Sequence, residues 1–247
     1  MKVIISGASG KMGKVVASLI EADKNAETVC GVDLYADNTS AFPIYQNFKQ
    51  VDDGDVIIDF SNPSVLPALL KYAVETHTPA VIATTGLSAA EIKSVEKVSQ
   101  HVPIFFTANM SLGVNLLTAL CKKAASVLGD NFDIEIVESH HNQKIDAPSG
   151  TALMLANAIN DTLDNSLNYV YDRHSKREKR TRNEIGIHAV RGGNIVGKHE
   201  VIFAGTDEII ELTHTATSKA VFANGAIAAA KFIVNKENGL YSMNDMI

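Results

Sequence analysis

A glycine-rich loop near the start of the sequence constrains the possible fold more than any other segment. GASGKMG follows a short apolar run at residues 3–6 and opens a helical pattern at residues 11–22. Gly7 would allow a tight turn, Gly10 would let a pyrophosphate approach the backbone, and Gly13 would let the helix lie close to a sheet. The spacing is G-x-x-G-x-x-G rather than G-x-G-x-x-G, so a glycine-rich turn without a ligand is the alternative.

The surroundings of this loop favour a dinucleotide site. A second apolar run at residues 27–33 ends in Asp33, whose carboxylate can accept hydrogen bonds from an adenosine ribose. A solvated turn aspartate is the alternative. No lysine or arginine appears between Leu34 and Lys49, although a ribose 2′-phosphate usually pairs with a cation there. We therefore expect NADH to work at least as well as NADPH. The expected loop contacts are Gly7, Ala8, Ser9, Gly10, Lys11, Met12 and Asp33.

Short apolar runs alternate with helical patterns through the first 110 residues. Pro63 begins one helical pattern, and Ser88 with Glu91 forms a capping box ahead of another. Strands this apolar, separated by helices, predict a Rossmann-like parallel sheet with helices on both faces. The predicted strands lie at residues 3–6, 27–33, 55–60, 80–84 and 103–106.

Two further loops leave the carboxyl ends of predicted strands, where ligands of open α/β sheets bind. Their threonine and asparagine side chains could contact a nicotinamide, whereas local capping of the turns is the alternative. The residues concerned are Ala83, Thr84, Thr85, Thr107, Ala108, Asn109 and Met110.

The pattern changes near residue 111, which indicates a second domain of α+β type. Its predicted helices lie at residues 112–128 and 152–163, and its predicted strands lie at residues 133–137, 185–191, 195–203 and 208–215. We expect a mostly antiparallel sheet in which Gly192, Gly193 and Asn194 form a hairpin turn.

The last helical pattern, at residues 219–234, is rich in small residues and is expected to return to the first domain. We therefore predict a dinucleotide-binding domain at residues 1–110 and 216–247. A substrate-binding and oligomerisation domain is predicted at residues 111–215, with hinge movement near residues 110 and 216.

A cluster of polar residues lies between a predicted strand and a predicted helix. Free backbone N–H groups and the positive end of the helix dipole collect at such a point, so a small carboxylate could bind there. A histidine exchanges protons near neutral pH, and a lysine can hold a carboxylate or donate a proton. The candidates are His140, His141, Lys144, Ser149, Gly150 and Thr151.

Each of these residues also has a simpler interpretation. The histidines could be exposed surface residues without a chemical role, and Lys144 could be solvated. The sole role of Ser149 could be to cap the helix. A metal site is not expected, because adjacent histidines cannot easily converge on one ion. Ser149 lacks the G-x-S-x-G elbow of a nucleophile. The remaining histidines are given structural or surface roles, and the basic run at residues 173–182 is interpreted as a mobile, solvated loop.

Composition narrows the class of protein. The chain has 247 residues, a net charge of −6 and 46% hydrophobic residues, which is typical of a cytoplasmic enzyme. This acidity argues against nucleic acid as the main partner. The last helical pattern contains Lys231 and is too short for a membrane span. Cys30 and Cys121 are widely separated and are expected to be buried free thiols.

The segment EIVESHHNQKIDAPSGTA resembles the signature of the dihydrodipicolinate reductase family. Further likeness is found in GASGKMG, ATTG, TANMS, VRGGNIVGKHEVIF and FANGA, so the resemblance covers essentially the whole chain. The signature positions that match are Glu135, Glu138, His140, Lys144, Asp146, Pro148, Ser149, Gly150, Thr151 and Ala152.

The resemblance implies a reductase of the diaminopimelate and lysine pathway that uses NADH or NADPH. It implies a homotetramer in which the second domain builds an intersubunit sheet, and a small cyclic dicarboxylate substrate. His140 would donate or accept a proton, Lys144 would donate one, and His141 with the Ser149–Gly150–Thr151 turn would bind substrate. Ala83 stands where family members often have glycine, so that cofactor contact departs from the family pattern.

Two other functions stay open at this point. One is another two-domain amino-acid-pathway dehydrogenase, of the aspartate or homoserine type. The other is a nucleotide-sensing protein that keeps a Rossmann domain without catalysis. The sequence also leaves open whether the hydrated or dehydrated ring binds, and how His140 and Lys144 divide proton transfer as a coupled pair.

Overall fold

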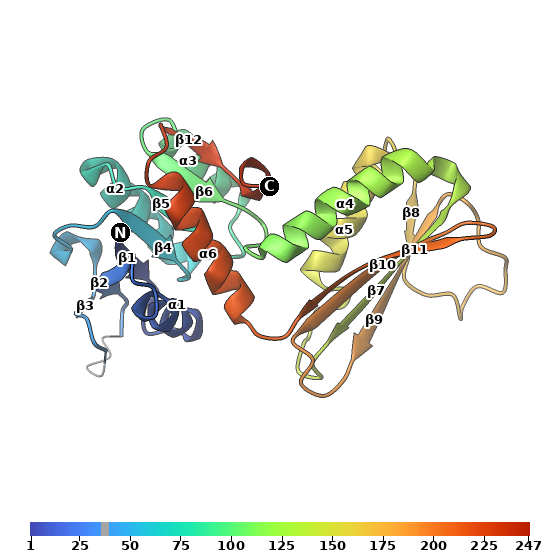
Figure 1. Ribbon diagram of the computed structural model, residues 1–247, viewed down its shortest axis with the longest axis horizontal. Coiled ribbons are helices and arrows are strands. Elements are labelled where there is room, and N and C mark those ends of the chain that lie inside the picture. Colours follow the sequence, from blue (N-terminus) through green and yellow to red (C-terminus); the bar gives the residue numbers. More distant parts are fainter. Residues whose placement is uncertain (36–39) are drawn as a thin grey trace. The chain divides into compact units, whose positions relative to one another are not determined.

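The computed structural model describes residues 1–35 and 40–247. It divides into two compact units (Figure 1). The first consists of Met1–Leu112 with Ala220–Ile247, and the second of Gly113–Lys219. Within the described residues, no helix is long and apolar enough to cross a membrane.

The first unit is built on a seven-stranded parallel sheet. Its strand order is β12-β6-β5-β4-β1-β2-β3, so the chain runs outward from β1 in both directions and creates a switch point between β1 and β4. Ligands of such sheets bind beyond the carboxyl ends of the strands near this point. The strands are β1 (Lys2–Ser6), β2 (Glu27–Val32), β3 (Ile44–Tyr45), β4 (Val56–Asp59), β5 (Ala80–Ile82), β6 (Pro103–Phe106) and β12 (Gly239–Tyr241).

Helices cover both faces of this sheet because its strands are apolar on both sides. On β1, Val3 and Ile5 face one apolar core while Ile4 faces the other, and all three are fully buried. Helices α1 (Lys11–Glu21) and α6 (Ala220–Ile233) pack in the first core. Helices α2 (Leu66–Thr76) and α3 (Ala89–Val98) pack in the second. Short 3₁₀ turns occur at η1 (Phe48–Gln50), η2 (Pro63–Val65) and η4 (Met243–Asp245).

Helix α6 approaches the sheet closely because its inner face carries small residues. It runs beside α1 and strands β4 to β6 (Figure 1). A Cβ atom added at Gly225 would lie 1.7 Å from the carbonyl oxygen of Met110. Glycine at this position therefore lets the helix backbone touch the loop that follows β6.

The second unit has a five-stranded mixed sheet with the order β11-β10-β7-β9-β8. One face packs against α4 (Leu112–Leu128) and α5 (Gly150–Thr162), where Ile136, Phe203 and Leu155 are fully buried. On β7 and β10 every second residue is buried, which is typical of a sheet with one covered face. The strands are β7 (Asp133–His140), β8 (Asn168–Val170), β9 (Glu184–Arg191), β10 (Gly197–Ala204) and β11 (Ile209–Ala216), with a 3₁₀ turn η3 (Gly129–Asn131).

The fold class predicted from the sequence is confirmed, but the predicted hairpin at Gly192–Asn194 is wrong. Strand β9 pairs in parallel with β7, while β10 pairs antiparallel with the opposite side of β7. The glycine segment therefore crosses from one side of β7 to the other. The short strands β3, β8 and β12 were not predicted. The other corrections are small: β7 continues to His140, α5 begins at Gly150, and the 63–76 helix starts with a 3₁₀ turn.

The basic segment 173–182 is also different from the solvated loop that we expected. Arg173 donates to Glu135 and Glu184, each at 2.9 Å. Arg180 donates to Glu135 at 2.9 Å and to Asp133 at 2.7 Å. These ion pairs fix both arginines against β7 and β9, so the segment is anchored to the sheet at two points.

Candidate active site

The glycine loop forms the tight turn that the sequence predicts. Gly7 has a φ of +79°, and a Cβ added there would lie 2.5 Å from the carbonyl oxygen of Phe60. A Cβ at Gly13 would lie 2.2 Å from the oxygen of Gly7. Gly10 caps α1 without a side-chain hydrogen bond. Gly10 therefore offers no side chain to the first amides of α1, and anions bind at such helix N-termini.

Asp33 fastens this loop to the end of β2. Its carboxylate accepts hydrogen bonds from the amides of Ser9 and Tyr35, each at 3.1 Å, and the Ser9 hydroxyl donates to the carbonyl of Tyr35. The carboxylate also borders a cavity of about 560 Å³. Among the residues lining that cavity are Gly7, Gly10, Asp33, Leu34, Tyr35 and Asn47.

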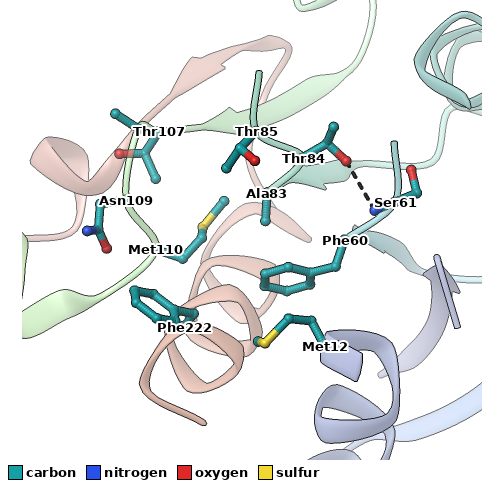
Figure 2. Close-up of a pocket in the computed structure, with 11 residues that line it drawn as sticks. Met12, Phe60, Ser61, Ala83, Thr84, Thr85, Thr107, Asn109, Met110 and Phe222 are labelled. Carbon is teal, nitrogen blue, oxygen red and sulfur yellow. Dashed lines mark hydrogen bonds between the residues drawn. The ribbon is translucent and has the colours of Figure 1, made fainter. Parts of the chain in front are cut away.

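A second cavity of about 410 Å³ is lined by both strand-end loops that the sequence identified, at residues 83–85 and 107–110. Figure 2 shows Met12, Phe60, Ala83 and Met110 pointing toward one another, with Phe222 nearby on α6. Sequence reasoning missed Phe60, Ser61 and Phe222 as lining residues. Phe60 follows directly on β4 as the other loops follow their strands, so this signal was available, whereas Phe222 comes from the last helix. The lining residues are Met12, Phe60, Ser61, Ala83, Thr84, Thr85, Thr107, Ala108, Asn109, Met110 and Phe222.

A buried carboxylate joins two of the loops that line this cavity. Asp59, at the end of β4, is fully buried and accepts hydrogen bonds from the hydroxyls of Ser61 at 2.5 Å and Thr84 at 2.7 Å. The Thr84 hydroxyl in turn accepts the amide of Ser61 at 3.1 Å (Figure 2). Burial raises the pKa of Asp59 although these hydrogen bonds oppose the rise.

The polar cluster of the second unit is organised around Glu138, which is fully buried on β7. Arg191, at the end of β9, holds its carboxylate with two hydrogen bonds of 2.7 and 2.8 Å. His140 Nδ1 lies 2.6 Å from Glu138 Oε2, and the amide of Ser149 donates to Oε1 at 3.0 Å. The parallel register of β7 and β9 places Arg191 directly beside His140.

Ser149 connects this cluster to the start of α5. Its hydroxyl caps the helix by accepting the amide of Ala152 at 3.2 Å. The same oxygen lies 3.0 Å from Nε2 of His199, a buried residue of β10. Gly150 and Thr151 form the first turn of α5, and a Cβ at Gly150 would meet no atom within 4 Å. The N-terminus of α5 is therefore open on the side of Gly150.

Lys144 and His141 lie in the loop between β7 and α5. The ammonium of Lys144 is 2.8 Å from the carboxylate of Asp146, and its amide donates to the carbonyl of His141 at 3.1 Å. Arg191 donates to the carbonyl of Asp146 at 2.6 Å. The arginine that holds Glu138 thus also fixes the backbone of the lysine loop.

His199 is a neighbour of His140 that sequence reasoning placed among the ordinary histidines. The two rings meet edge to face with centroids 5.1 Å apart. Burial, together with the nearby His140, lowers the pKa of His199 to about 4. His199 is therefore neutral at physiological pH and can hydrogen-bond Ser149 without adding charge.

The parallel sheet with its glycine loop and the polar cluster of the second unit define a two-domain, pyridine-nucleotide-dependent oxidoreductase. The family model described as "Dihydrodipicolinate reductase, N-terminus" matches residues 1–110. The model described as "Dihydrodipicolinate reductase, C-terminus" matches residues 113–247. The chain belongs to the dihydrodipicolinate reductase family.

Similar proteins agree with this assignment. The chain is 54% identical to the 4-hydroxy-tetrahydrodipicolinate reductase of Caldanaerobacter subterraneus subsp. tengcongensis, with 100% of this chain and 98% of that protein covered. Identity to the enzyme of the same name from Clostridium novyi is 47% with the same coverage.

Solved structures show the same fold. A dipicolinate-bound dihydrodipicolinate reductase from Paenisporosarcina sp. TG-14 has a TM-score of 0.84 at 23% identity and covers 100% of this chain and 99% of its own. An aspartate dehydrogenase from Thermotoga maritima has a TM-score of 0.54 at 13% identity, covering 96% of this chain and 98% of its own. The second likeness shows that the two-unit plan extends to other dehydrogenases, but the family models favour the reductase.

Proposed function

We propose that this enzyme reduces 4-hydroxy-tetrahydrodipicolinate, or its dehydrated ring, with NADH or NADPH in the diaminopimelate route to lysine. The observation that carries the proposal is the cluster in which His140, the capped N-terminus of α5 and Lys144 occupy one short segment of the second unit. The names of relatives at up to 54% identity and the dipicolinate bound in the structural neighbour support the same substrate class.

The first unit would hold the cofactor. Its glycine loop would receive the pyrophosphate, because Gly7 and Gly13 allow the tight turn that leads into the N-terminus of α1, where anions bind. Asp33 would accept from the adenosine ribose, and the cavity beside β5 and β6 would receive the nicotinamide. The bound nicotinamide would supply a hydride to the ring. The proposed contacts are Gly7, Ala8, Ser9, Gly10, Lys11, Met12, Asp33, Ala83, Thr84, Thr85, Thr107, Ala108, Asn109 and Met110.

The second unit would bind the ring dicarboxylate and supply the proton. The amides of Gly150 and Thr151 at the start of α5 would hold one carboxylate, assisted by Ser149 and His141. Addition of hydride to the dehydrated, unsaturated ring leaves an enamine anion, whose negative charge Lys144 and the helix amides would stabilise. A hydrated ring would first lose water. Transfer of a proton from His140 or Lys144 to ring carbon then completes tetrahydrodipicolinate. General-acid catalysis of this kind contributes about 10²–10⁴-fold to the rate.

We also propose a homotetramer that assembles through the five-stranded sheet and acts in the cytoplasm. The face of that sheet opposite α4 and α5 carries exposed apolar residues at its rim, including Val190 and Ile209. Light scattering after gel filtration tests the proposal. A mass of four 26.5 kDa chains is expected, and a monomer would contradict it.

The function itself is tested by the absorbance of NADH and NADPH at 340 nm with freshly generated substrate. We expect rapid, substrate-dependent oxidation of the cofactor. Parallel reactions with aspartate and homoserine and oxidised cofactor test the dehydrogenase alternatives. Turnover of either amino acid, or no oxidation with the ring substrate, would contradict the proposal.

A further inference from the structure

We propose that Glu138, clamped by Arg191, is a positioning residue that fixes the tautomer of His140. In this arrangement Nδ1 carries the proton and Nε2 is the nitrogen that exchanges a proton with the substrate. The position of the proton follows from the hydrogen bonds of Glu138 alone. The catalytic consequence rests on the proposed function, which assigns proton transfer to His140.

Every acceptor position of Glu138 is filled by a donor. Oε1 accepts from Arg191 Nη2 at 2.7 Å and from the amide of Ser149 at 3.0 Å. Oε2 accepts from Arg191 Nη1 at 2.8 Å and lies 2.6 Å from His140 Nδ1. A guanidinium and a backbone amide can only donate, and an ionised carboxylate can only accept. The short contact with His140 is therefore a hydrogen bond only if Nδ1 is the donor.

Glu138 is ionised in this environment. Burial raises the pKa of its carboxyl group, but the hydrogen bonds from Arg191, His140 and Ser149 outweigh burial and bring the pKa below its usual range. A hydroxyl at the Oε1 position would face only the donors Arg191 and Ser149, whereas a hydroxyl at the Oε2 position could face His140 but would weaken the charge-assisted pair with Arg191. The hydrogen-bond donors around Glu138 therefore favour the carboxylate form, in agreement with the lowered pKa.

The surroundings of the second ring nitrogen suit a proton-exchanging atom. A Cβ added at Gly197 would lie 3.2 Å from His140 Nε2, so glycine at this position leaves that side of the ring uncrowded. The neutral ring of His199 lies edge to face with it. Nδ1 is committed to Glu138, which leaves Nε2 as the ring nitrogen for the substrate.

The variant Glu138→Gln changes the donor pattern with almost no change in shape. The NH2 group of the glutamine side chain must occupy one of the two carboxylate oxygen positions. At the Oε1 position it would meet two fixed donors, Arg191 and Ser149. At the Oε2 position it would meet Arg191 and His140, and His140 can become an acceptor by moving its proton to Nε2. We therefore expect Glu138→Gln to reverse the tautomer of His140.

The strand also provides a matched control. Glu135 lies on β7 three residues before Glu138 and has the same kinds of partner, His188 Nε2 at 2.8 Å and two arginines. The variant Glu135→Gln removes one carboxylate charge from the same strand without touching Glu138. It should leave the tautomer of His140 unchanged.

Neutron diffraction from crystals of the full-length protein without ligands, grown at alkaline pD, locates the deuterons directly. The expected result is a deuteron on Nδ1 of His140 in the wild type and in Glu135→Gln, and on Nε2 in Glu138→Gln. A wild-type deuteron on Nε2 alone would overturn the proposal without the need for any variant. An unchanged tautomer in a folded Glu138→Gln protein would overturn it as well.

Kinetics then separate this proposal from the proposed function. If both hold, Glu138→Gln lowers kcat by about 10²–10⁴-fold, the range of general-acid catalysis, while KM for NADH stays close to the wild-type value. If the tautomer reverses but kcat is unchanged, Glu138 positions His140 and the catalytic role of His140 is wrong. If the ring substrate is not reduced even by the wild type, the proposed function fails while the neutron result still stands.

Discussion

His199 Nε2 lies 3.0 Å from the hydroxyl of Ser149, so a buried histidine of β10 is tied to the residue that caps α5. Because His199 is neutral in the folded protein, it lowers the free energy of unfolding in acid. Its pKa is about 4 in the folded protein, with burial as the main cause, against an ordinary value of 6.5. Because the folded state resists protonation of this ring, His199 contributes stability above pH 6.5 that is lost progressively as the pH falls from 6.5 to 4.

We predict that acid destabilises the wild type more than a His199→Gln variant. The unfolded chain binds the extra proton below pH 6.5, which gives a loss of about 2–3 kcal/mol between pH 7 and pH 4.5 from this group. Urea unfolding of both proteins at the two pH values measures the difference. Equal losses in wild type and variant would show that His199 is already free to protonate in the fold.

Replacement of Lys144 by alanine is predicted to lower kcat by about 10²–10⁴-fold, the contribution of a general acid. Binding of NADH, measured by fluorescence titration, should stay intact because the described residues that line the two cavities belong to the first unit, whereas Lys144 belongs to the second. Lys198→Ala is the matched control, since Lys198 pairs with Glu200 two residues away, at 2.9 Å, just as Lys144 pairs with Asp146. A loss of only a few-fold in a folded Lys144→Ala protein would remove Lys144 from the mechanism.

NADH is predicted to support a kcat/KM at least as high as NADPH. A 2′-phosphate would lie beside the Asp33 carboxylate, which is already held by the amides of Ser9 and Tyr35. Steady-state kinetics with both cofactors at matched ionic strength test this expectation. A strong preference for NADPH would contradict it and would direct attention to a more distant cation such as Lys11.

The variant Gly225→Ala is predicted to destabilise the protein although alanine is the better helix former. Helix propensity alone would favour alanine by about 1 kcal/mol. The added Cβ would, however, lie 1.7 Å from the Met110 carbonyl oxygen, and overpacking of this kind costs about 1–3 kcal/mol. Thermal unfolding decides the sign. Gly192→Ala, where a Cβ would meet no atom within 4 Å, serves as the control and should unfold close to the wild type.

Local sequence patterns predicted the parts of the fold that depend on neighbouring residues. The glycine loop, the alternation of strands and helices, and the capping box of Ser88 and Glu91 are all local features, and the structure contains each of them. The same is true of Ser149 as the cap of α5.

Partners that come from distant strands could not be predicted in this way. Arg191 and His199 reach the cluster through the register of β9 and β10 on either side of β7, and that register depends on a crossover with no local signature. The glycines at 192 and 193 were typical of a hairpin, which is why the sequence favoured the wrong connection. Phe222 reaches its cavity for a related reason, since α6 packs onto a sheet formed more than a hundred residues earlier.

Deuterium in the cofactor makes it possible to follow the hydride into the ring. The enzyme is incubated with freshly generated 4-hydroxy-tetrahydrodipicolinate and NADH that carries deuterium at the transferred position of the nicotinamide. We expect mass spectrometry to show a ring dicarboxylate product that contains a single deuterium, formed about 10²–10⁴-fold more slowly by Lys144→Ala. A product without deuterium, or cofactor oxidation with no reduced ring dicarboxylate, would contradict it.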